Sequence, residues 1–388
     1  MGGRRIRVAW LSGPVPLESG HLTLLAEQVD LMLVASEGPG KGVSSPGVEG
    51  VPVADVRALG ARNTHIRWIY PALGRRLSDF RPDVVHVVVE PWGLLAVQAA
   101  LWVRRHPDTR LVLHGCDRIW WHGGRLEQLA KRVLARVSLR VASGFAAETS
   151  AVAPLARSAG LAVGAPTAQI HTQPRDPQQF RPPTAEERAA GRSELGLPAH
   201  GPGVAFVGRM VPEKGPLVLL EAWRRLAPEV RQDAWLALAG TGPLDELVAH
   251  TAEGCEGVHV LGAVPFPDGI LALSRAAEIA VVPSYTVPDW DDQSPRAVIE
   301  GLLSGAVVVG SASGGIPVML EDAGILVREQ DPEDLARGLT EALAVVREPA
   351  LAAEATAQAV ARGTAAYSVA CVAEQLNELW SRCLAVRT

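Results

Sequence analysis

Two positive charges lie five residues apart, just after a short apolar run. The chain contains only three lysines, and one of them, Lys214, follows Arg209 in the segment FVGRMVPEKGP. Gly215 and Pro216 then precede the amphipathic run LVLLEAWRRL, which predicts that a helix begins there. Helix N-terminal amides, a guanidinium and an ammonium together favour an anion. We interpret this segment, with Gly208 allowing close backbone approach, as a candidate diphosphate site; a solvated loop lysine is the alternative.

Two carboxylates form a second candidate site. Asp292 lies in a loop, and Glu300 lies eight residues further on, inside a helix predicted at 295–304 from Ser294 as N-cap and Pro295 as the first helical residue. Carboxylate oxygens accept hydrogen bonds from vicinal sugar hydroxyls, so the pair is a candidate for binding ribose or hexose rings. The alternative for Asp292 is a helix N-terminal charge stabilised by the helix dipole.

Short apolar runs alternate with longer helical patterns in both halves of the chain, which indicates an α/β protein with two parallel sheets. Strands are expected at 5–12, 31–36, 84–90, 110–115 and 144–149, and again at 203–208, 235–240, 258–264, 279–284, 306–311 and 324–327. A proline-rich stretch separates the two sets and is interpreted as a linker. The predicted organisation is a first domain at 1–170, a linker at 171–202, a second domain at 203–367 and a C-terminal helix at 368–388 that returns to the first domain.

Composition excludes several classes of protein. The net charge of −5 with mixed signs argues against nucleic-acid binding, and no apolar run reaches the roughly 20 residues of a membrane span. The N-terminus does not match a signal peptide, and four cysteines without CxxC spacing suit a reduced cytoplasm. The first strand is not followed by GxGxxG, and no Walker motif is present, so dinucleotide and P-loop binding are not predicted. Gly20, after that strand, is either a turn glycine or a point of close approach to a ligand.

The second half of the chain resembles the donor half of retaining GT-B glycosyltransferases of glycosyltransferase family 4. The resemblance rests on FVGRMVPEKG at 206–215, Pro283 with Ser284, the Asp292 and Glu300 pair, and GGIP at 314–317. It implies two Rossmann-like domains facing each other across a cleft. It also implies a nucleoside diphosphate sugar as co-substrate, with no cofactor and no metal.

The resemblance assigns roles to these residues. Arg209 and Lys214 would hold the diphosphate, Glu300 the ribose and Asp292 the transferred sugar. His114, at the end of a predicted strand, would face the donor sugar, with a core histidine as the alternative. The expected catalytic residues are therefore His114, Arg209, Lys214 and Asp292.

The remaining site residues are expected around these. The predicted nucleotide-sugar site comprises Gly20, Gly208, Arg209, Lys214, Gly240, Val264, Asp292, Ser294, Pro295, Arg296 and Glu300. The predicted acceptor site comprises Glu18, Glu90, Trp92, Trp120 and Trp121, with a partly buried core role as the alternative for the adjacent tryptophans. The polar cluster of His114, Cys116, Asp117 and His122 matches no standard zinc spacing, so no metal site is predicted.

Departures from the family pattern fall on the sugar side of the site. Asp292 stands where the usual residue is Glu, Ser294 with Pro295 replaces the usual Phe-Gly, and Val318 replaces the Glu that often follows GGIP. The sequence thus predicts a retaining transfer from a UDP- or GDP-linked sugar, either with an unusual sugar or with catalysis lost. The acceptor is expected to be a small molecule, and the strong preference for arginine suits a GC-rich bacterium and antibiotic biosynthesis. The alternatives are an inactive nucleotide-sugar binding protein and a GT-B epimerase or phosphorylase.

Overall fold

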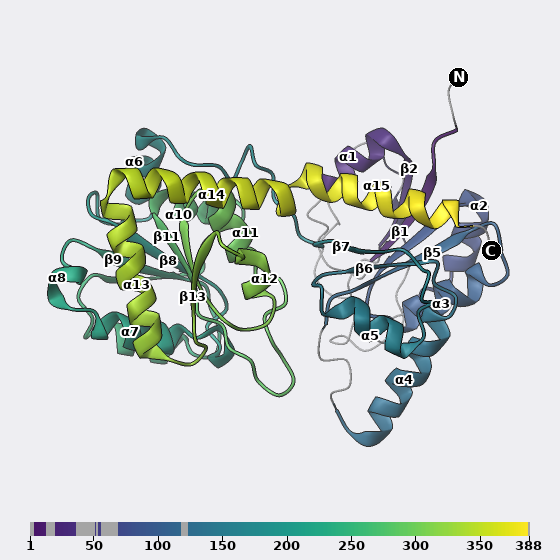
Figure 1. The fold of residues 1–388 in the computed structure, drawn as a ribbon, viewed down its shortest axis with the longest axis horizontal. Helices are drawn as coiled ribbons and strands as arrows, with labels where there is room; N and C mark the ends of the chain where they lie inside the picture. Colours follow the sequence, from purple (N-terminus) through teal and green to yellow (C-terminus); the bar gives the residue numbers. More distant parts are fainter. Residues whose placement is uncertain are drawn as a thin grey trace. The chain divides into compact units, whose positions relative to one another are not determined.

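The computed structural model describes residues 4–12, 20–35, 51, 53–55, 69–117 and 123–386 (Figure 1). The chain forms two compact units. Unit 1 comprises Met1–Pro174 and Val369–Thr388, and unit 2 comprises Arg175–Ser368. The chain therefore crosses between the units twice, once before Arg175 and once after Ser368.

Unit 1 contains a parallel sheet with the strand order β3-β2-β1-β4-β5-β6-β7 in its described part. The five strands predicted in this half are confirmed, whereas β3 and β7 were not predicted because each has only three residues. The strands are β1 (Arg7–Ser12), β2 (Asp30–Ala35), β3 (Val53–Asp55), β4 (Val84–Val88), β5 (Arg110–Gly115), β6 (Gly144–Ala147) and β7 (Thr167–Gln169).

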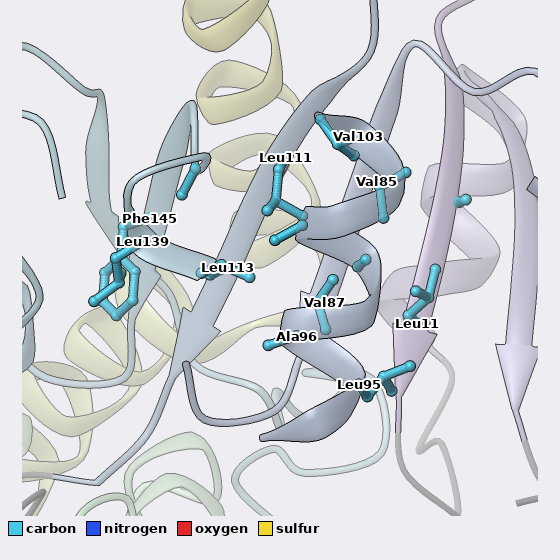
Figure 2. Close-up of a cluster of buried hydrophobic side chains, with 14 of the residues drawn as sticks. Leu11, Val85, Val87, Leu95, Ala96, Val103, Leu111, Leu113, Leu139 and Phe145 are labelled. Atoms are coloured by element: carbon cyan, nitrogen blue, oxygen red, sulfur yellow. The ribbon is translucent and has the colours of Figure 1, made fainter. Parts of the chain in front are cut away.

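Alternating side chains of these strands form a core on each face of the sheet. Ala9 and Leu11 of β1 point into one core, and Val8 and Trp10 point into the other. The first core lies under α2 (Leu73–Phe80), α3 (Leu94–Val103), α4 (Arg125–Leu139) and α5 (Val152–Ala159). Figure 2 shows Leu95, Ala96 and Val103 of α3 against Val85, Val87, Leu111 and Leu113 of the sheet. The second core lies under α1 (Gly20–Gln28) and α15 (Val369–Ala385).

Unit 2 repeats this plan with the strand order β10-β9-β8-β11-β12-β13 and parallel pairing throughout. All six strands predicted in this half are confirmed: β8 (Gly203–Val207), β9 (Trp235–Ala239), β10 (Val258–Gly262), β11 (Ile279–Val282), β12 (Val307–Ser311) and β13 (Gly324–Val327). One core lies under α7 (Pro216–Arg225), α9 (Asp245–Ala252) and α13 (Pro332–Arg347). The helices of the other face are α6 (Ala185–Glu194), α10 (Asp268–Ala276), α11 (Arg296–Leu303), α12 (Ile316–Leu320) and α14 (Pro349–Tyr367), while η2 (Pro212–Lys214) and α8 (Pro228–Arg231) are short connections.

The stretch 171–202 was predicted to be a linker, but the structure assigns it to unit 2 from Arg175 onward. Its prolines flank α6, which begins with a capping box between Thr184 and Glu187 and packs on α10 of unit 2. Arg192 of α6 is nearly buried and donates to Glu278 at 2.8 Å. Proline at turns and helix starts gives the same composition as a flexible connection, which explains the error.

None of the helices in the described part of the chain has the length and apolar character needed to cross a bilayer.

Candidate functional site

The predicted donor site begins at two neighbouring strands of unit 2. β8 and β11 lie side by side, and the strand order reverses between them. Ligands of open α/β sheets bind outside the carboxyl ends of the strands at such a reversal. Gly208 follows β8, and Ser284 lies just beyond β11. The two sequence segments that carry the candidate chemistry therefore start at the same edge of one sheet.

A pocket of about 340 Å³ opens at this edge, within unit 2. Phe206, Phe266 and Ser284 contribute to its walls. It also gathers seven residues of the predicted donor site: Gly208, Arg209, Lys214, Val264, Pro295, Arg296 and Glu300. A larger hollow of about 1130 Å³ lies at the amino ends of β8 and β9, and none of the predicted site residues lines it.

A glycine holds the loop after β8 against the loop after β11. Gly215 has a φ of 72°, and a Cβ added to it would lie 2.2 Å from the carbonyl oxygen of Pro283. Only glycine fits this position without displacing the backbone. Pro216 then begins α7, as the sequence predicted. This path brings the side chain of Lys214 to the pocket wall.

Lys214 and Asp292 form an ion pair beside the pocket. The Nζ atom lies 2.5 Å from Oδ2 of Asp292, with side-chain exposures of 19% and 8%. Ser284 Oγ donates to the same oxygen at 2.6 Å, and the ring centroid of Trp290 lies 5.0 Å from Nζ. Because an ammonium has three N–H donors, Lys214 can bind Asp292 and still donate to phosphate oxygens.

The GGIP segment fixes the backbone of Asp292. Gly314 has a φ of 58°, and a Cβ on it would lie 2.2 Å from the Asp292 carbonyl oxygen. Gly315 N donates to that oxygen at 2.8 Å. The Asp292 carboxylate accepts hydrogen bonds from Lys214, in the loop after β8, and from Ser284, in the loop after β11. The helix α11 begins only at Arg296. These contacts favour a site residue over a helix N-terminal charge.

The other predicted cation is more exposed. The Arg209 side chain is 60% exposed, and its Nη2 lies 3.5 Å from Glu213 Oε1. An exposed ion pair at this distance contributes little free energy, so Arg209 can leave Glu213 and bind a more highly charged anion. Arg209 therefore lies at the mouth of the pocket with its charge accessible, whereas Lys214 is held in place.

Glu300 lies in the wall of the pocket and is bound by an arginine that the sequence did not indicate. Arg175 Nε donates to Glu300 Oε1 at 2.9 Å, and Arg175 Nη2 lies 2.9 Å from the same oxygen. Both side chains are nearly buried, at 5% and 6% exposure. Glu300 is thus a buried and ion-paired carboxylate on the predicted ribose side of the pocket.

Four predicted donor residues lie outside the pocket lining, and Asp292, described above, is one of them. Gly240 supports Gly208, since its φ is 137° and a Cβ on it would lie 1.8 Å from the Gly208 carbonyl oxygen. Ser294 was predicted as the N-cap of α11. The observed N-cap is Pro295, so the helix begins one residue later than predicted. Gly20 begins α1, where an added Cβ would lie 2.9 Å from Val369. Helix packing within unit 1 thus accounts for Gly20.

His114 was predicted to face the donor sugar, and the structure places it in the core of unit 1. It has no exposed surface, one ring nitrogen lies 3.4 Å from His86 Nε2, and the other lies 3.0 Å from the Ile170 carbonyl oxygen. His86 in turn accepts from Trp380 Nε1 at 3.0 Å. A fully enclosed ring cannot contact a sugar, so the core alternative holds.

The predicted acceptor residues are only partly described. Trp92 was expected to line a cleft, but it is fully buried in the core under α3, so that prediction is corrected. Glu90 accepts the amides of Cys116 and Asp117 at 2.7 and 2.9 Å, and burial together with the Asp117 charge raises its pKa well above the usual range. The other three predicted acceptor residues, Glu18, Trp120 and Trp121, lie outside the described residues.

Sequence reasoning missed several residues of the site, among them Arg175, Phe266 and Trp290. Trp290 stood within the same loop as Asp292 and could have been noticed as an aromatic next to the acids. Arg175 and Phe266 gave no local signal. No group of His, Cys, Asp and Glu suited to a metal occurs among the residues that the structure describes, and His122 of the metal set considered above lies outside them.

Comparison with known proteins places the fold. Along 97% of the chain the structure matches the Anabaena Alr3699/HepE structure in complex with UDP, over 100% of that protein, with a TM-score of 0.73 and 18% identity. It matches sucrose-phosphate synthase from Thermosynechococcus elongatus over 98% of the chain and 100% of that protein, with a TM-score of 0.72 and 19% identity. The chain has the GT-B fold. The predicted fold class of two Rossmann-like α/β domains is thereby confirmed.

Sequence similarity centres on a part of this GT-B chain. Residues 201–344, within unit 2, match the family model described as Glycosyl transferases group 1. Proteins named D-inositol 3-phosphate glycosyltransferase are similar: that of Corynebacterium kroppenstedtii is 33% identical over 174 residues, which is 42% of this chain and 38% of that protein. The one from Mycolicibacterium vanbaalenii is 35% identical over 175 residues, again 42% and 38%. The matches thus span about two fifths of these relatives.

Proposed function

We propose that the chain is a retaining glycosyltransferase of family 4 that transfers a sugar from a nucleoside diphosphate sugar to a small-molecule acceptor. The observation that carries the proposal is the pocket at the β8–β11 reversal, which Arg209, Lys214 and Glu300 line together. It lies within the segment that matches the glycosyl transferases group 1 model. The named complexes of the HepE relative with UDP and with UDP-glucose support a nucleotide-sugar donor.

The diphosphate would bind between the two cations. Lys214 offers donors that its pair with Asp292 leaves available, and Arg209 offers a planar fork from the mouth of the pocket. The two side chains differ in exposure, at 19% and 60%. Charge-assisted hydrogen bonds from the less exposed group are stronger because less solvent screens them. We therefore assign most of the diphosphate affinity to Lys214.

The two carboxylates would hold the sugars of the donor. Glu300, in the wall of the pocket, would accept hydrogen bonds from the ribose hydroxyls. Asp292, fixed by Gly314 and bonded to Ser284, would contact the transferred sugar, with the ring of Trp290 nearby. Asp is one methylene shorter than the Glu usual in this family, so the pocket suits a donor sugar of altered shape.

The transfer would proceed with retention. The acceptor oxygen attacks the anomeric carbon on the face from which the diphosphate departs, so the new C–O bond forms as the bond to the phosphate oxygen breaks. The departing phosphate oxygen receives the acceptor proton. In this scheme the protein contributes orientation and stabilises the charge that develops on the diphosphate. The cations Lys214 and Arg209 are the groups placed for that task.

We further propose a cytoplasmic enzyme of natural-product biosynthesis with UDP or GDP as the nucleotide. All four cysteines are thiols, which suits a reducing compartment. The relatives named for D-inositol 3-phosphate support a cyclitol-like acceptor. An inactive nucleotide-sugar binding protein is the second candidate, because the residues that depart from the family pattern, Asp292, Ser294 and Pro295, all belong to the part of the site that we assign to the sugar.

Nucleotide release separates these functions. The purified chain is incubated with UDP-glucose or GDP-mannose, with and without inositol and an aminocyclitol, and free nucleotide is measured. A transferase releases nucleotide only when an acceptor is present. A binding protein retains the donor under all conditions, and release of sugar phosphate on adding inorganic phosphate would indicate a phosphorylase. The same assay is applied to Arg209→Ala, a variant of the pocket. Its matched control is Arg225→Ala, which removes an arginine of α7 that is 49% exposed.

A further inference from the structure

We propose that Arg175 is a positioning residue for ribose recognition, acting through Glu300, and that it ties the nucleotide pocket to the point where the chain enters unit 2. The inference rests on the proposed function, in which Glu300 binds ribose. Arg175 itself does not line the pocket, whereas Glu300 does. Its effect on a ligand would therefore be transmitted through the carboxylate.

The geometry of the pair fixes one oxygen of Glu300. Two nitrogens of the guanidinium, Nε and Nη2, each lie 2.9 Å from Oε1. Of these two nitrogens only Nε donates a hydrogen bond, and a directed bond from the planar guanidinium holds this oxygen in place more tightly than a contact from a freely rotating ammonium would. Since both side chains are nearly buried, little solvent competes for these bonds. Arg175 thus holds the position of Oε1 of Glu300.

Aromatic rings hold Arg175 itself in place. The carbon Cζ of its guanidinium lies 5.8 Å from the ring centroid of Phe180 and 5.7 Å from that of Phe266. Cation–π attraction favours this placement of an arginine. Phe266 also lines the pocket, so two pocket-lining residues, Phe266 and Glu300, contact the same guanidinium.

The backbone of Arg175 lies at both crossings between the units. Unit 2 begins at Arg175 and ends at Ser368. These two residues form an isolated parallel β-bridge, and Arg175 N donates to the Tyr367 carbonyl oxygen at 3.0 Å. A side chain that fixes a ribose-binding carboxylate is therefore attached to the backbone position where both connections meet. A substitution of Arg175 would therefore release Oε1 of Glu300.

A purely structural ion pair is the competing explanation. Such a pair would stabilise unit 2 without distinguishing among nucleotides. The two explanations differ for a ligand that lacks the hydroxyl groups that Glu300 would accept from. UDP and 2′,3′-dideoxy-UDP provide this comparison, because they share base and diphosphate and differ only at the ribose.

The experiment measures the affinity of both nucleotides by calorimetry for wild type, Arg175→Gln, Arg175→Lys and Glu300→Gln. We expect wild type to prefer UDP. Arg175→Gln should weaken the affinity for UDP by roughly 10- to 100-fold, the range for loss of charge-assisted hydrogen bonds. The affinity for 2′,3′-dideoxy-UDP should stay unchanged. Arg175→Lys should recover part of the loss. The matched control is Arg181→Gln, a nearby exposed arginine paired with Glu187 at 2.7 Å, which should alter neither affinity.

A double variant guards against a folding defect. Removing one member of a buried ion pair leaves the other charge uncompensated, whereas Arg175→Gln with Glu300→Gln removes both charges. If Arg175 acts through Glu300, the double variant binds UDP no more weakly than Glu300→Gln alone. An additional loss in the double variant, or equal weakening of UDP and 2′,3′-dideoxy-UDP in Arg175→Gln, would overturn the positioning role.

The wild-type measurements separate this inference from the proposed function. If wild type binds none of UDP, GDP, ADP and dTDP, the proposed function fails and the inference fails with it. If wild type binds UDP and 2′,3′-dideoxy-UDP equally, the ribose role of Glu300 is wrong. If wild type prefers UDP and Arg175→Gln keeps that preference at full strength, only the role of Arg175 is wrong.

Discussion

The two units share a strand order but differ in how the described side chains near their central strands are arranged. In unit 2 the loops after β8 and β11 meet through Gly215 and leave a pocket lined by charged side chains. In unit 1 the corresponding reversal lies between β1 and β4, and there Trp10 stacks on His86 with ring centroids 4.4 Å apart. Trp380 of α15 donates to His86 and helps to enclose it. Glycine loops create a pocket in unit 2, whereas in the described part of unit 1 the rings of Trp10, His86 and Trp380 pack together on one face of the sheet.

A second group of described polar residues in unit 1, around Glu148, is bonded internally. Glu148 lies 3.7 Å from His114 Nε2 and 3.5 Å from His171 Nδ1, and it accepts from Thr172 N at 3.1 Å. Burial acts to raise the pKa of Glu148, but its hydrogen bonds and the charges of the two imidazoles lower it well below the usual range overall. Polar residues after a strand thus indicate a ligand site only where the loops leave space for the ligand.

The largest expected effect concerns this network in unit 1. Glu148→Ala leaves the surrounding donors without their acceptor, so we expect the free energy of unfolding to fall by about 3 to 5 kcal/mol. Nucleotide affinity should not change, because Glu148 belongs to unit 1 and the residues that line the donor pocket belong to unit 2. Urea unfolding followed by tryptophan fluorescence measures the first quantity and calorimetry the second. A stable variant would mean that the network contributes little, and the contrast between the units would then need another cause.

Lowering the pH should reduce the free energy of unfolding of unit 1 before it changes nucleotide binding in the pocket of unit 2. Burial, and then the charge of His114, lowers the pKa of His21 to about 4 and that of His86 well below its usual value. Between about pH 6.5 and pH 4 the unfolded chain binds protons that the folded chain does not, so the free energy of unfolding falls as pH falls through this window. We expect His21 to contribute a loss of about 2 kcal/mol from pH 7.5 to 5, while Glu90, whose pKa is raised, acts in the opposite direction; urea unfolding measures the sum.

A substitution at His21 tests the source of that loss. His21→Gln should reduce the pH dependence, whereas His250→Gln, at a side chain that is 82% exposed, should not. Equal pH dependence in wild type and His21→Gln would show that the acid-sensitive groups lie elsewhere.

Within unit 2, Asp292→Asn should separate the nucleotide from the sugar. Loss of the carboxylate charge leaves Lys214 without its ion-pair partner but available to phosphate, so affinity for free nucleoside diphosphate should be unchanged or slightly higher. Donor affinity or transfer rate should fall by about 1 to 3 kcal/mol, because a hydrogen-bonded carboxylate at the sugar is lost. Calorimetry with UDP and UDP-glucose, together with turnover, tests this. Normal transfer by Asp292→Asn would contradict its assignment to the sugar.

The smallest expected effect is at the mouth of the pocket. Arg209→Ala should weaken nucleoside diphosphate by only about 1 kcal/mol, and raising the salt concentration should diminish the difference, because the side chain is largely exposed. The control Arg225→Ala should bind as wild type does. An effect of Arg209→Ala that exceeds that of Lys214→Ala would reverse the proposed ranking of the two cations.

Local sequence was sufficient to predict most of the fold. Every predicted strand is present because apolar runs of four or more residues separated by glycine and proline turns are a strong signal. The segments around Lys214 and Asp292 were also identified, because Lys214 follows Arg209 and precedes Gly215 at a predicted helix start, and because Glu300 follows Asp292 by eight residues. The three-residue strands β3 and β7 offered too short a pattern, and α6 was obscured by the prolines around it.

Long-range partners were beyond local sequence. Arg175 and Glu300 are 125 residues apart, and nothing near Arg175 indicates a carboxylate partner. His114 looked like a site residue because it ends a strand, and its burial depends on a network that reaches Trp380 in the last helix of the chain. The sequence thus indicated which residues could do chemistry in unit 2 but not which polar residues of unit 1 are enclosed.

Nucleotide affinity of wild type and Lys214→Ala tests the central claim most directly. UDP, GDP, ADP and dTDP are titrated by calorimetry into both proteins, with folding of the variant verified by its thermal transition. We predict that at least one of the four binds wild type and that Lys214→Ala weakens it by roughly 1.5 to 3 kcal/mol, the range for a lost charge-assisted hydrogen bond. Wild-type affinity in a folded Lys214→Ala variant, or no binding of any of the four nucleotides to wild type, would contradict the assignment of this pocket to a nucleoside diphosphate.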